Sequence, residues 1–250
     1  MNKICCLIPA RYGSSRLNGK PLLKIKDKTV IQRTYEQTLK SKYLDNSNVY
    51  ITTDDDRIID HIKTFGGKYI KVTEECLNGT ERICHALKQM NNEYDIILNV
   101  QGDEPFIDPD NIDLCISKYL EKDDNNVVCT TIHFNIKESN MLNDRGIGKL
   151  ITDKYDNIIY CSRALIPHTK SGNPDSNFTY NGHIGIFVFD SNYLKEYLQH
   201  PNTPCQLSED IEWLKIIEMG YKIRSYCVKE SEIGINTPED YQYLLNKYQN

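Results

Sequence analysis

The sequence predicts an α/β fold built on a doubly wound, mainly parallel β-sheet. Short apolar runs without helical period, typical of buried strands, alternate with segments of helical period through the first half of the chain. This alternation indicates strand, helix, strand units joined by right-handed crossovers. A chain of 250 residues is also long enough to bury a sizeable core. We therefore expect one domain that carries an embedded subdomain.

Strands and helices alternate in the first half. Strands are expected at 4–8, 49–52, 69–72, 96–100 and 127–132, where the runs are short and apolar. Helices are expected between them, at 30–39, 54–65, 79–90 and 109–120. The helix at 54–65 ends at the pair Gly66-Gly67.

The second half departs from this alternation. Runs at 149–152 and 158–161 flank a polar turn at 154–157, which predicts a β-hairpin. A further strand is expected at 185–189, returning to the sheet. The polar segment 170–177 has no periodicity and is a candidate to close over a ligand.

Charge and composition exclude several classes of function. A formal net charge of -5 argues against nucleic acid as a partner, so an anionic ligand must meet a local cluster of cations. No apolar run approaches about 18 residues, and the N-terminus leads directly into a strand, so we expect a cytosolic protein without a membrane partner. The nine cysteines form no C-x-x-C pair, and we interpret them as reduced, small hydrophobic residues.

Residues 8–22 (IPARYGSSRLNGKPL) form a candidate cradle for a nucleoside triphosphate. The loop leaves the carboxyl end of the first strand, where open α/β sheets bind ligands. Gly13 lets the backbone approach a phosphate, and hydroxyl groups and cations follow from Ser14, Ser15, Arg11, Arg16 and Lys20. A Walker A loop does not fit, because five residues separate the two glycines and Pro21 follows the lysine. The structural alternative is a solvated basic loop.

A second motif, residues 96–105 (IILNVQGDEP), is an apolar run that ends in an acidic pair. Asp103 is a candidate Mg²⁺ ligand, because this cation takes one or two carboxylates together with substrate phosphates. The alternative is that Asp103 and Glu104 only open a turn before Pro105. The Gln101 amide offers a donor and an acceptor to the edge of a base.

Two polar segments open helices. In 78–82 (NGTER), Asn78 or Thr80 is expected to cap the helix, and the functional alternative places this turn against a base or ribose. The segment 53–57 (TDDDR) is similar to the D-x-D of glycosyltransferases. Capping of the helix that follows is the favoured interpretation.

The second half adds a cation, an imidazole and an amide. Arg163 and His183 are candidates to contact an anionic sugar, although a single histidine is more often structural. In 234–240 (GINTPED), Thr237 is the expected N-cap and Pro238 the first helical residue. Capping leaves Asn236 unexplained, and we expect its side chain to point into the site.

Together with YCSRALIP and GHIGI, these motifs resemble those of the 3-deoxy-manno-octulosonate cytidylyltransferases, in the same order and over essentially the whole chain. The resemblance implies a nucleotidyltransferase type of sheet with an inserted β-rich region, and a homodimer. It divides the single domain 1–250 into a CTP-binding part (1–134), a sugar-binding and dimerisation part (135–225), and a C-terminal return with the metal-site loop (226–250). The implied reaction converts CTP and the acidic sugar to CMP-octulosonate and pyrophosphate, with Mg²⁺, in lipopolysaccharide biosynthesis.

The resemblance also implies roles for individual residues. Nucleotide binding is assigned to Ala10, Arg11, Gly13, Ser14, Lys20, Thr80 and Gln101. Sugar binding is assigned to Arg163, His183 and Glu212, and metal binding to Asp103 and Asn236. Arg11, Lys20 and Asp103 are expected to act in catalysis.

Three departures from the family pattern bear on metal and substrate. Asn18 replaces a proline, a mild change in loop stiffness. Asn236 stands where the family has aspartate, so metal affinity is expected to fall or one ion to be absent. Trp213 replaces an amide in the sugar-facing region. The alternatives are a cytidylyltransferase for another acidic sugar (8-amino-octulosonate or sialic-acid-like), a catalytically lapsed nucleotide-binding protein, and a D-x-D glycosyltransferase.

Overall fold

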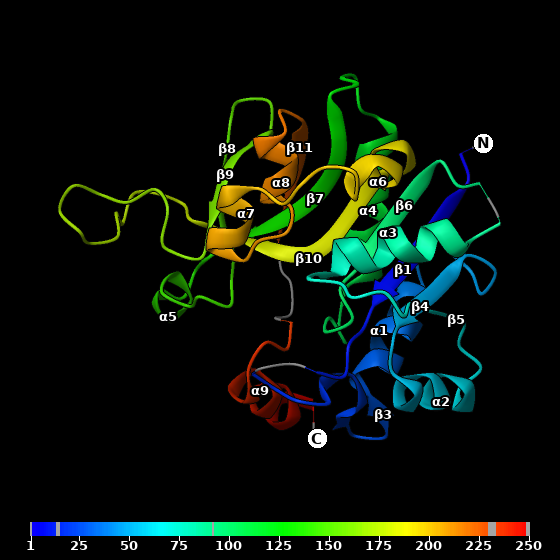
Figure 1. Cartoon of the computed structure of the whole chain (residues 1–250). Helices are drawn as coiled ribbons and strands as arrows, with labels where there is room; N and C mark the ends of the chain where they lie inside the picture. Colours follow the sequence, from blue (N-terminus) through cyan, green and yellow to red (C-terminus); the bar gives the residue numbers. More distant parts are fainter. Residues whose placement is uncertain (1, 14–15, 92, 230–233, 249–250) are drawn as a thin grey trace.

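A twisted sheet forms the centre of the molecule (Figure 1). The computed structural model describes residues 2–13, 16–91, 93–229 and 234–248. The main strands are β1 (Ile4–Pro9), β4 (Val49–Thr53), β5 (Tyr69–Lys71), β6 (Ile96–Val100), β7 (Val127–Asn135), β10 (Asn181–Asp190) and β11 (Lys222–Val228). They lie in the order β11-β7-β10-β6-β1-β4-β5.

Most neighbouring strands are parallel. β1 pairs with β4 and β6, β4 pairs with β5, and β7 pairs with β11. The exception is β10, which lies between β6 and β7 and is antiparallel to both. The doubly wound, mainly parallel sheet is thus confirmed, and the strand predicted at 185–189 returns to the sheet as part of a longer strand that begins at Asn181.

A hairpin extends the sheet near β10. β8 (Lys149–Thr152) and β9 (Ile158–Ser162) pair antiparallel, as predicted, and β8 also pairs with β10. The segment between β9 and β10 projects away from the sheet at the left of Figure 1. Its residues 170–177 are exposed, and none of them lines the cavity described below.

Helices cover both faces of the sheet. The helices α3 (Gly79–Gln89), α6 (Ser191–Tyr197) and α8 (Leu214–Glu218) share one apolar cluster, and α1 (Val30–Thr38), α2 (Asp56–Thr64) and α4 (Pro109–Leu120) share another. In β1, Cys5 and Leu7 belong to the first cluster, whereas Cys6 and Ile8 belong to the second. A strand buried on both faces has no polar side to show, which is why its sequence is a continuous apolar run.

The C-terminal helix α9 (Pro238–Tyr248) packs beside the short strands β2 (Lys24–Ile25) and β3 (Lys28–Thr29), at the bottom of Figure 1. Ile25, Val30, Ile235 and Leu244 form the buried cluster that joins them. This packing places the segment with Asn236 next to the 3₁₀ helix η1 (Lys20–Leu22), where Lys20 donates to the Ile235 carbonyl. The remaining short helices are α5 (Ser139–Leu142) and α7 (Pro204–Glu209).

Side chains cap the predicted helix starts. Asn78, rather than Thr80, accepts from the Glu81 N–H at 2.9 Å and caps α3. Asp55 accepts from the Arg57 N–H at 2.9 Å, which confirms that TDDDR caps α2. Thr237 accepts from the Asp240 N–H at 3.2 Å at the start of α9.

The cysteines are unbridged, and most are buried in the core. Burial raises the pKa of the Cys5 and Cys115 thiols to about 12, so both stay protonated. Over the described part of the chain, no helix is long and apolar enough to cross a bilayer.

Candidate active site

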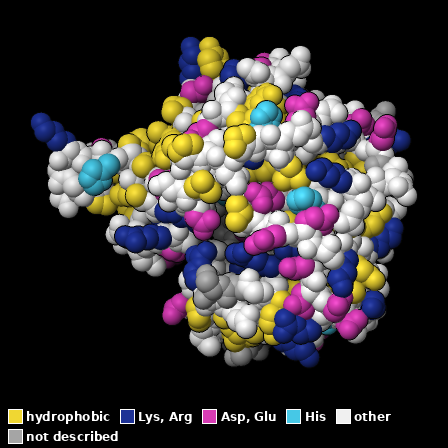
Figure 2. All heavy atoms as spheres, in the orientation of Figure 1, with side chains coloured by type: hydrophobic (Ala, Val, Ile, Leu, Met, Phe, Trp, Pro, Cys, Tyr) yellow, Lys and Arg dark blue, Asp and Glu magenta, His cyan; other side chains and the backbone are white. Residues whose placement is uncertain are grey.

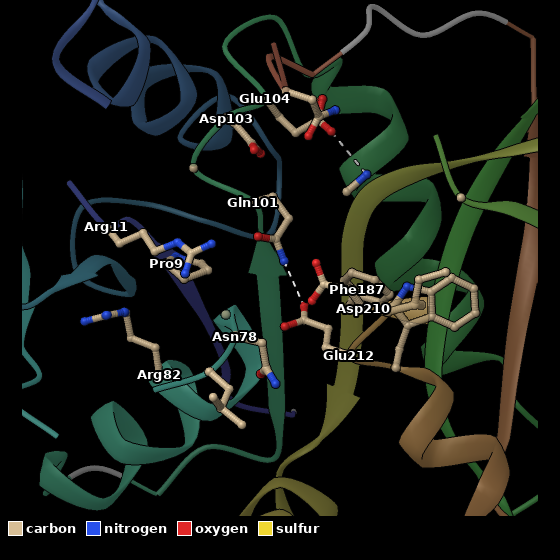
Figure 3. A pocket seen from close by; sticks show the side chains of 18 of the residues that line it. Pro9, Arg11, Asn78, Arg82, Gln101, Asp103, Glu104, Phe187, Asp210 and Glu212 are labelled. Carbon is tan, nitrogen blue, oxygen red and sulfur yellow. Dashed lines mark hydrogen bonds between the residues drawn. The ribbon is translucent and has the colours of Figure 1, made fainter. Parts of the chain in front are cut away.

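A cavity of about 440 Å³ opens where β1 and β6 end. Figure 2 shows it as a hollow near the middle of this face, with Lys and Arg side chains below it and Asp and Glu side chains above it. One side, the strand-end wall, carries Arg11, Arg16, Lys20, Arg82, Gln101 and Asp103. The other side, the β10 wall, carries Arg163, His183, Phe187, Glu212 and Trp213. In Figure 3, Gln101 lies between Arg11 and Glu212, at the border of the two walls.

Most of the predicted site residues come together here. Those that line the cavity are Ala10, Arg11, Lys20, Gln101, Asp103, Arg163, His183, Glu212 and Asn236. Gly13 is exposed and is not among the lining residues, and Ser14 lies outside the described residues. Thr80 is buried behind the lining, where its backbone N–H contacts Glu212.

Lys20 joins the two segments that carry the predicted metal ligands. Its ammonium nitrogen lies 2.6 Å from Asp103 Oδ2 and donates to the Ile235 carbonyl, also at 2.6 Å. The Ile235 N–H donates to the Asp103 carbonyl at 2.9 Å. These contacts fix the segment with Asn236 beside Asp103, although 132 residues of sequence separate Asp103 from Ile235.

Glu104 is structural rather than open to solvent. Its Oε1 accepts from the Gly185 N–H at 3.2 Å, and the Gly185 carbonyl accepts from the Gln101 N–H at 2.9 Å. A Cβ on Gly185 would lie 2.8 Å from Glu104 Oε1, so a larger residue there would displace this carboxylate. Burial, with a smaller contribution from Asp103, raises the pKa of Glu104 to about 8. The sequence motif did not indicate these hydrogen bonds between the turn at Glu104 and β10.

Glu212 bridges the two walls. Its Oε2 accepts from the Thr80 N–H at 2.9 Å, and its Oε1 accepts from Gln101 Nε2 at 3.1 Å, the contact drawn in Figure 3. Burial raises the pKa of Glu212, and the hydrogen bonds from Thr80 and Gln101 oppose that effect. Glu212, which was predicted to bind the sugar, therefore contacts Thr80 and Gln101, which were predicted to bind the nucleotide.

Arg163 is held by backbone carbonyls. Its Nε donates to Glu209 at 3.3 Å, its Nη1 to Arg145 at 3.3 Å and Gly146 at 3.1 Å, and its Nη2 to Asp210 at 2.8 Å. Because a guanidinium has five N–H donors, at most one remains for a ligand. The side chain thus ties together the segments around β9 and α7, in addition to lining the cavity.

His183 is a neutral imidazole in an aromatic stack. Its ring centroid lies 4.8 Å from that of Phe187 and 5.0 Å from that of Trp213. The Thr131 hydroxyl donates to the Ile186 carbonyl at 2.6 Å, so it accepts from His183 Nε2–H at 2.8 Å, and Nδ1 is left as an acceptor. Burial lowers the pKa of His183 to about 3. Trp213 packs against this ring and is only 5% exposed.

Arg82 is a lining residue that we assigned no role from sequence. Its side chain is 6% exposed, and its charged contacts are long, with Nη1 3.4 Å from Asp54 Oδ1. Arg82 and Arg11 are both drawn at the left of Figure 3, and both line the cavity. The position of Arg82 three residues after Gly79 on α3 places it on the helix face that meets the cavity, and this spacing is the signal that could have identified it.

The groups around Asp103 suit a hard cation. The Asp103 carboxylate and the Ile235 carbonyl lie together, since the Lys20 ammonium binds both, and Asn236, the residue after Ile235, also lines the cavity. Magnesium prefers such oxygen donors and commonly uses few protein ligands beside substrate phosphates. The described residues contain no cluster of three His, Cys, Asp or Glu side chains suited to a metal. The donor set therefore fits an ion that is shared with a nucleotide.

Comparisons with known proteins agree with this site. Residues 5–224 match the cytidylyltransferase family. The chain is 40% identical over 238 residues to the 3-deoxy-manno-octulosonate cytidylyltransferase of Zea mays, covering 95% of this chain and 78% of that one. It is 39% identical over 240 residues to the protein of the same name from Protochlamydia amoebophila (strain UWE25), covering 95% and 91%. A solved structure of CMP:2-keto-3-deoxy-manno-octonic acid synthetase complexed with CTP superposes with a TM-score of 0.86, at 31% identity and with 98% of each chain covered. The chain therefore belongs to the 3-deoxy-manno-octulosonate cytidylyltransferase family and is a nucleotidyltransferase.

Proposed function

We propose that this protein transfers the cytidylyl group of CTP to 3-deoxy-manno-octulosonate and releases pyrophosphate. The observation that carries the proposal is one cavity with two unlike walls: cations gather beside Asp103 on the strand-end wall, and Arg163, His183 and Glu212 face them from the β10 wall. The names of the relatives and the CTP complex of the related structure support it.

In the proposed reaction, a sugar hydroxyl oxygen forms a bond to the α-phosphorus of CTP. The bond from that phosphorus to the bridging oxygen of pyrophosphate breaks. Arg11 and Lys20 neutralise the charge on the equatorial and leaving oxygens, since charge-assisted contacts are strongest in a site that excludes water. The partly buried setting of Lys20, whose side chain is 16% exposed, supports this role.

Magnesium belongs to the proposal. Asp103 and the neutral amide of Asn236 are the residues that would hold it. When bound, the ion supplies charge neutralisation at the phosphates and lowers the pKa of the attacking hydroxyl. Replacement of a carboxylate by an amide at Asn236 is expected to weaken metal binding.

The sugar end suits a ligand with several hydroxyl groups, and the acidic character of the substrate rests on the family resemblance. Arg163 offers at most one N–H, His183 offers a neutral acceptor nitrogen, and Glu212 offers carboxylate oxygens. A second candidate substrate is another acidic sugar, such as an 8-amino-octulosonate or a sialic acid. The packing of Trp213 against His183 favours considering it, because the indole fixes the position of the imidazole.

The proposal also includes a homodimer, a cytoplasmic location and a place in lipopolysaccharide biosynthesis. These rest on the family resemblance.

The test is pyrophosphate release from CTP and Mg²⁺ with four additions: 3-deoxy-manno-octulosonate, its 8-amino analogue, N-acetylneuraminate, or no sugar. Release with the first sugar alone supports the proposal and shows that Asn236 permits catalysis. If pyrophosphate is released only with another acidic sugar, the proposed reaction stands and that sugar is the substrate. CTP binding without release in any arm would instead indicate a lapsed nucleotide-binding protein.

A further inference from the structure

We infer that Lys20 occupies the magnesium position in the nucleotide-free protein, so that metal and nucleotide must enter together. The Lys20 ammonium contacts Asp103 Oδ2 and the Ile235 carbonyl oxygen, each at 2.6 Å. These are two of the oxygens that a magnesium ion at this place would need. The inference rests on the proposed function, because it gives CTP the task of moving Lys20.

The backbone prepares this position before any metal binds. The Ile235 N–H donates to the Asp103 carbonyl at 2.9 Å, so the carboxylate and the Ile235 carbonyl are carried by two segments already joined to each other. The side chains of Lys20 and Asp103 are 16% and 25% exposed. A pair this shielded is screened less by water and salt than an exposed ion pair. The ammonium is therefore a real competitor for a divalent ion.

The local charge balance opposes entry of a metal alone. Asp103 supplies one negative charge, which Lys20 already balances, and the Asn236 amide supplies none. The neighbouring Glu104 carboxyl is buried and directs its Oε1 to the Gly185 N–H. Among the described residues, a divalent cation here would thus meet the Lys20 ammonium and the Asp103 carboxylate, while the Asp240 carboxylate accepts from the backbone N–H groups of Asn236 and Thr237.

A triphosphate changes this balance for both cations. Its oxygens offer Lys20 an alternative anionic partner and offer the metal further ligands. Lys20 then moves from Asp103 to the phosphates as the metal takes its place. The exchange predicts that Lys20 lowers metal affinity when CTP is absent and ceases to do so when CTP is bound.

The decisive measurement is a titration with Mn²⁺, followed by electron paramagnetic resonance, on the protein without nucleotide or sugar. Lys20→Met is expected to bind Mn²⁺ about three- to tenfold more tightly than wild type, the range expected for loss of a competing ion pair. Lys28→Met is the matched control. It breaks another lysine–carboxylate pair of 2.6 Å, to Glu36, outside the cavity, and should bind Mn²⁺ as wild type does.

Two further arms complete the test. Asp103→Asn in the Lys20→Met background should abolish the gain in affinity, and saturating CTP should remove the advantage of Lys20→Met over wild type. Thermal unfolding checks each variant, and Lys20→Gln replaces Lys20→Met if the latter does not fold. Equal or weaker Mn²⁺ binding by the folded Lys20 variant overturns the inference, as does the absence of binding by both proteins. Failure of the proposed function would appear separately, as absence of pyrophosphate release with every sugar.

Discussion

The two walls of the cavity are built in different ways. On the strand-end wall, Arg11 and Asp103 follow closely after buried parallel strands, and η1, which begins at Lys20, is the next element after β1. On the β10 wall, Arg163 and His183 hydrogen-bond to other parts of the protein, and Trp213 is buried against the His183 ring. The strand-end wall presents charged groups to a ligand. On the β10 wall, most hydrogen-bonding groups of Arg163 and His183 are already bonded to other parts of the protein.

This difference predicts different consequences of substitution. Changes on the strand-end wall should impair the reaction more than they destabilise the fold, because Arg11 and Asp103 follow rigid strands and carry charge into the cavity. Changes on the β10 wall should first cost stability, because they remove hydrogen bonds and ring contacts that hold the segments of this wall together.

The largest effect is expected for Asp103→Asn. Loss of this charge should lower kcat for pyrophosphate release about 10²- to 10³-fold, as is typical for removal of one group that stabilises developing charge. The thermal midpoint should fall less than for Arg163→Lys, although the Lys20 ion pair is lost, and this order would sharpen the contrast between the walls. Asp60→Asn, which breaks an exposed pair with Lys63 on α2, is the control. Retention of more than about a tenth of the activity would remove Asp103 from the reaction.

Arg163→Lys is expected to cost about 2 kcal/mol in the free energy of unfolding, because an ammonium cannot bind the four carbonyls that the guanidinium contacts. Chemical denaturation measures this loss, and KM for the sugar is measured in parallel. Arg57→Lys is the control, because Arg57 is 60% exposed and its guanidinium pairs with one carboxylate, that of Asp55. If stability is unchanged while KM rises, Arg163 acts on the ligand alone and the contrast between the walls is broken.

His183 should make stability depend on pH. Its folded-state pKa of about 3 lies below the ordinary value of 6.5, so the neutral ring contributes stability that is complete above pH 6.5 and is lost as the pH falls toward 3. Between these two pH values, the free energy of unfolding should fall by up to about 1.4 kcal/mol per pH unit. In His183→Gln this component is absent, so the difference in unfolding free energy between wild type and variant should shrink from pH 7 to pH 4. His168→Gln, in the exposed projecting segment, should keep the wild-type profile. A His183→Gln profile parallel to that of wild type would contradict the buried, neutral ring.

The smallest effect is expected for Asp56→Ala. Asp56 is 73% exposed and pairs with Lys71 at 2.6 Å, so its loss should change the free energy of unfolding by no more than about 0.5 kcal/mol. Pyrophosphate release should be unchanged, because Asp56 does not line the cavity. A large loss of pyrophosphate release would instead show that Asp56 acts in the reaction from outside the cavity lining.

Much of the strand-end wall could be predicted from consecutive residues. The run at 4–8 indicated a strand buried on both faces, and the cations after it indicated an anion site at the strand's carboxyl end. The run that ends at Asp103 gave the same argument for a neighbouring strand. Parallel pairing of β1 and β6 then brings the two strand ends together.

The β10 wall required the folded chain. Glu212 meets Thr80 across 132 residues and Gln101 across 111, and Glu104 meets Gly185 across 81. No local period or cap encodes such contacts, because they depend on how β10 inserts antiparallel between β6 and β7. The burial that shifts the pKa of His183 arises from the same packing.

By itself, the sequence determined the alternation of strands and helices, the capping segments at 78–80 and 53–57, the cap at Thr237, and the charged loops at the strand ends. Each of these follows from interactions between residues near one another in the chain. Only the tertiary structure decided that Lys20 binds Asp103, that Arg163 binds backbone carbonyls, and that Glu212 spans the cavity. These pairings join distant segments, and the packing of the whole sheet with its helices selects them.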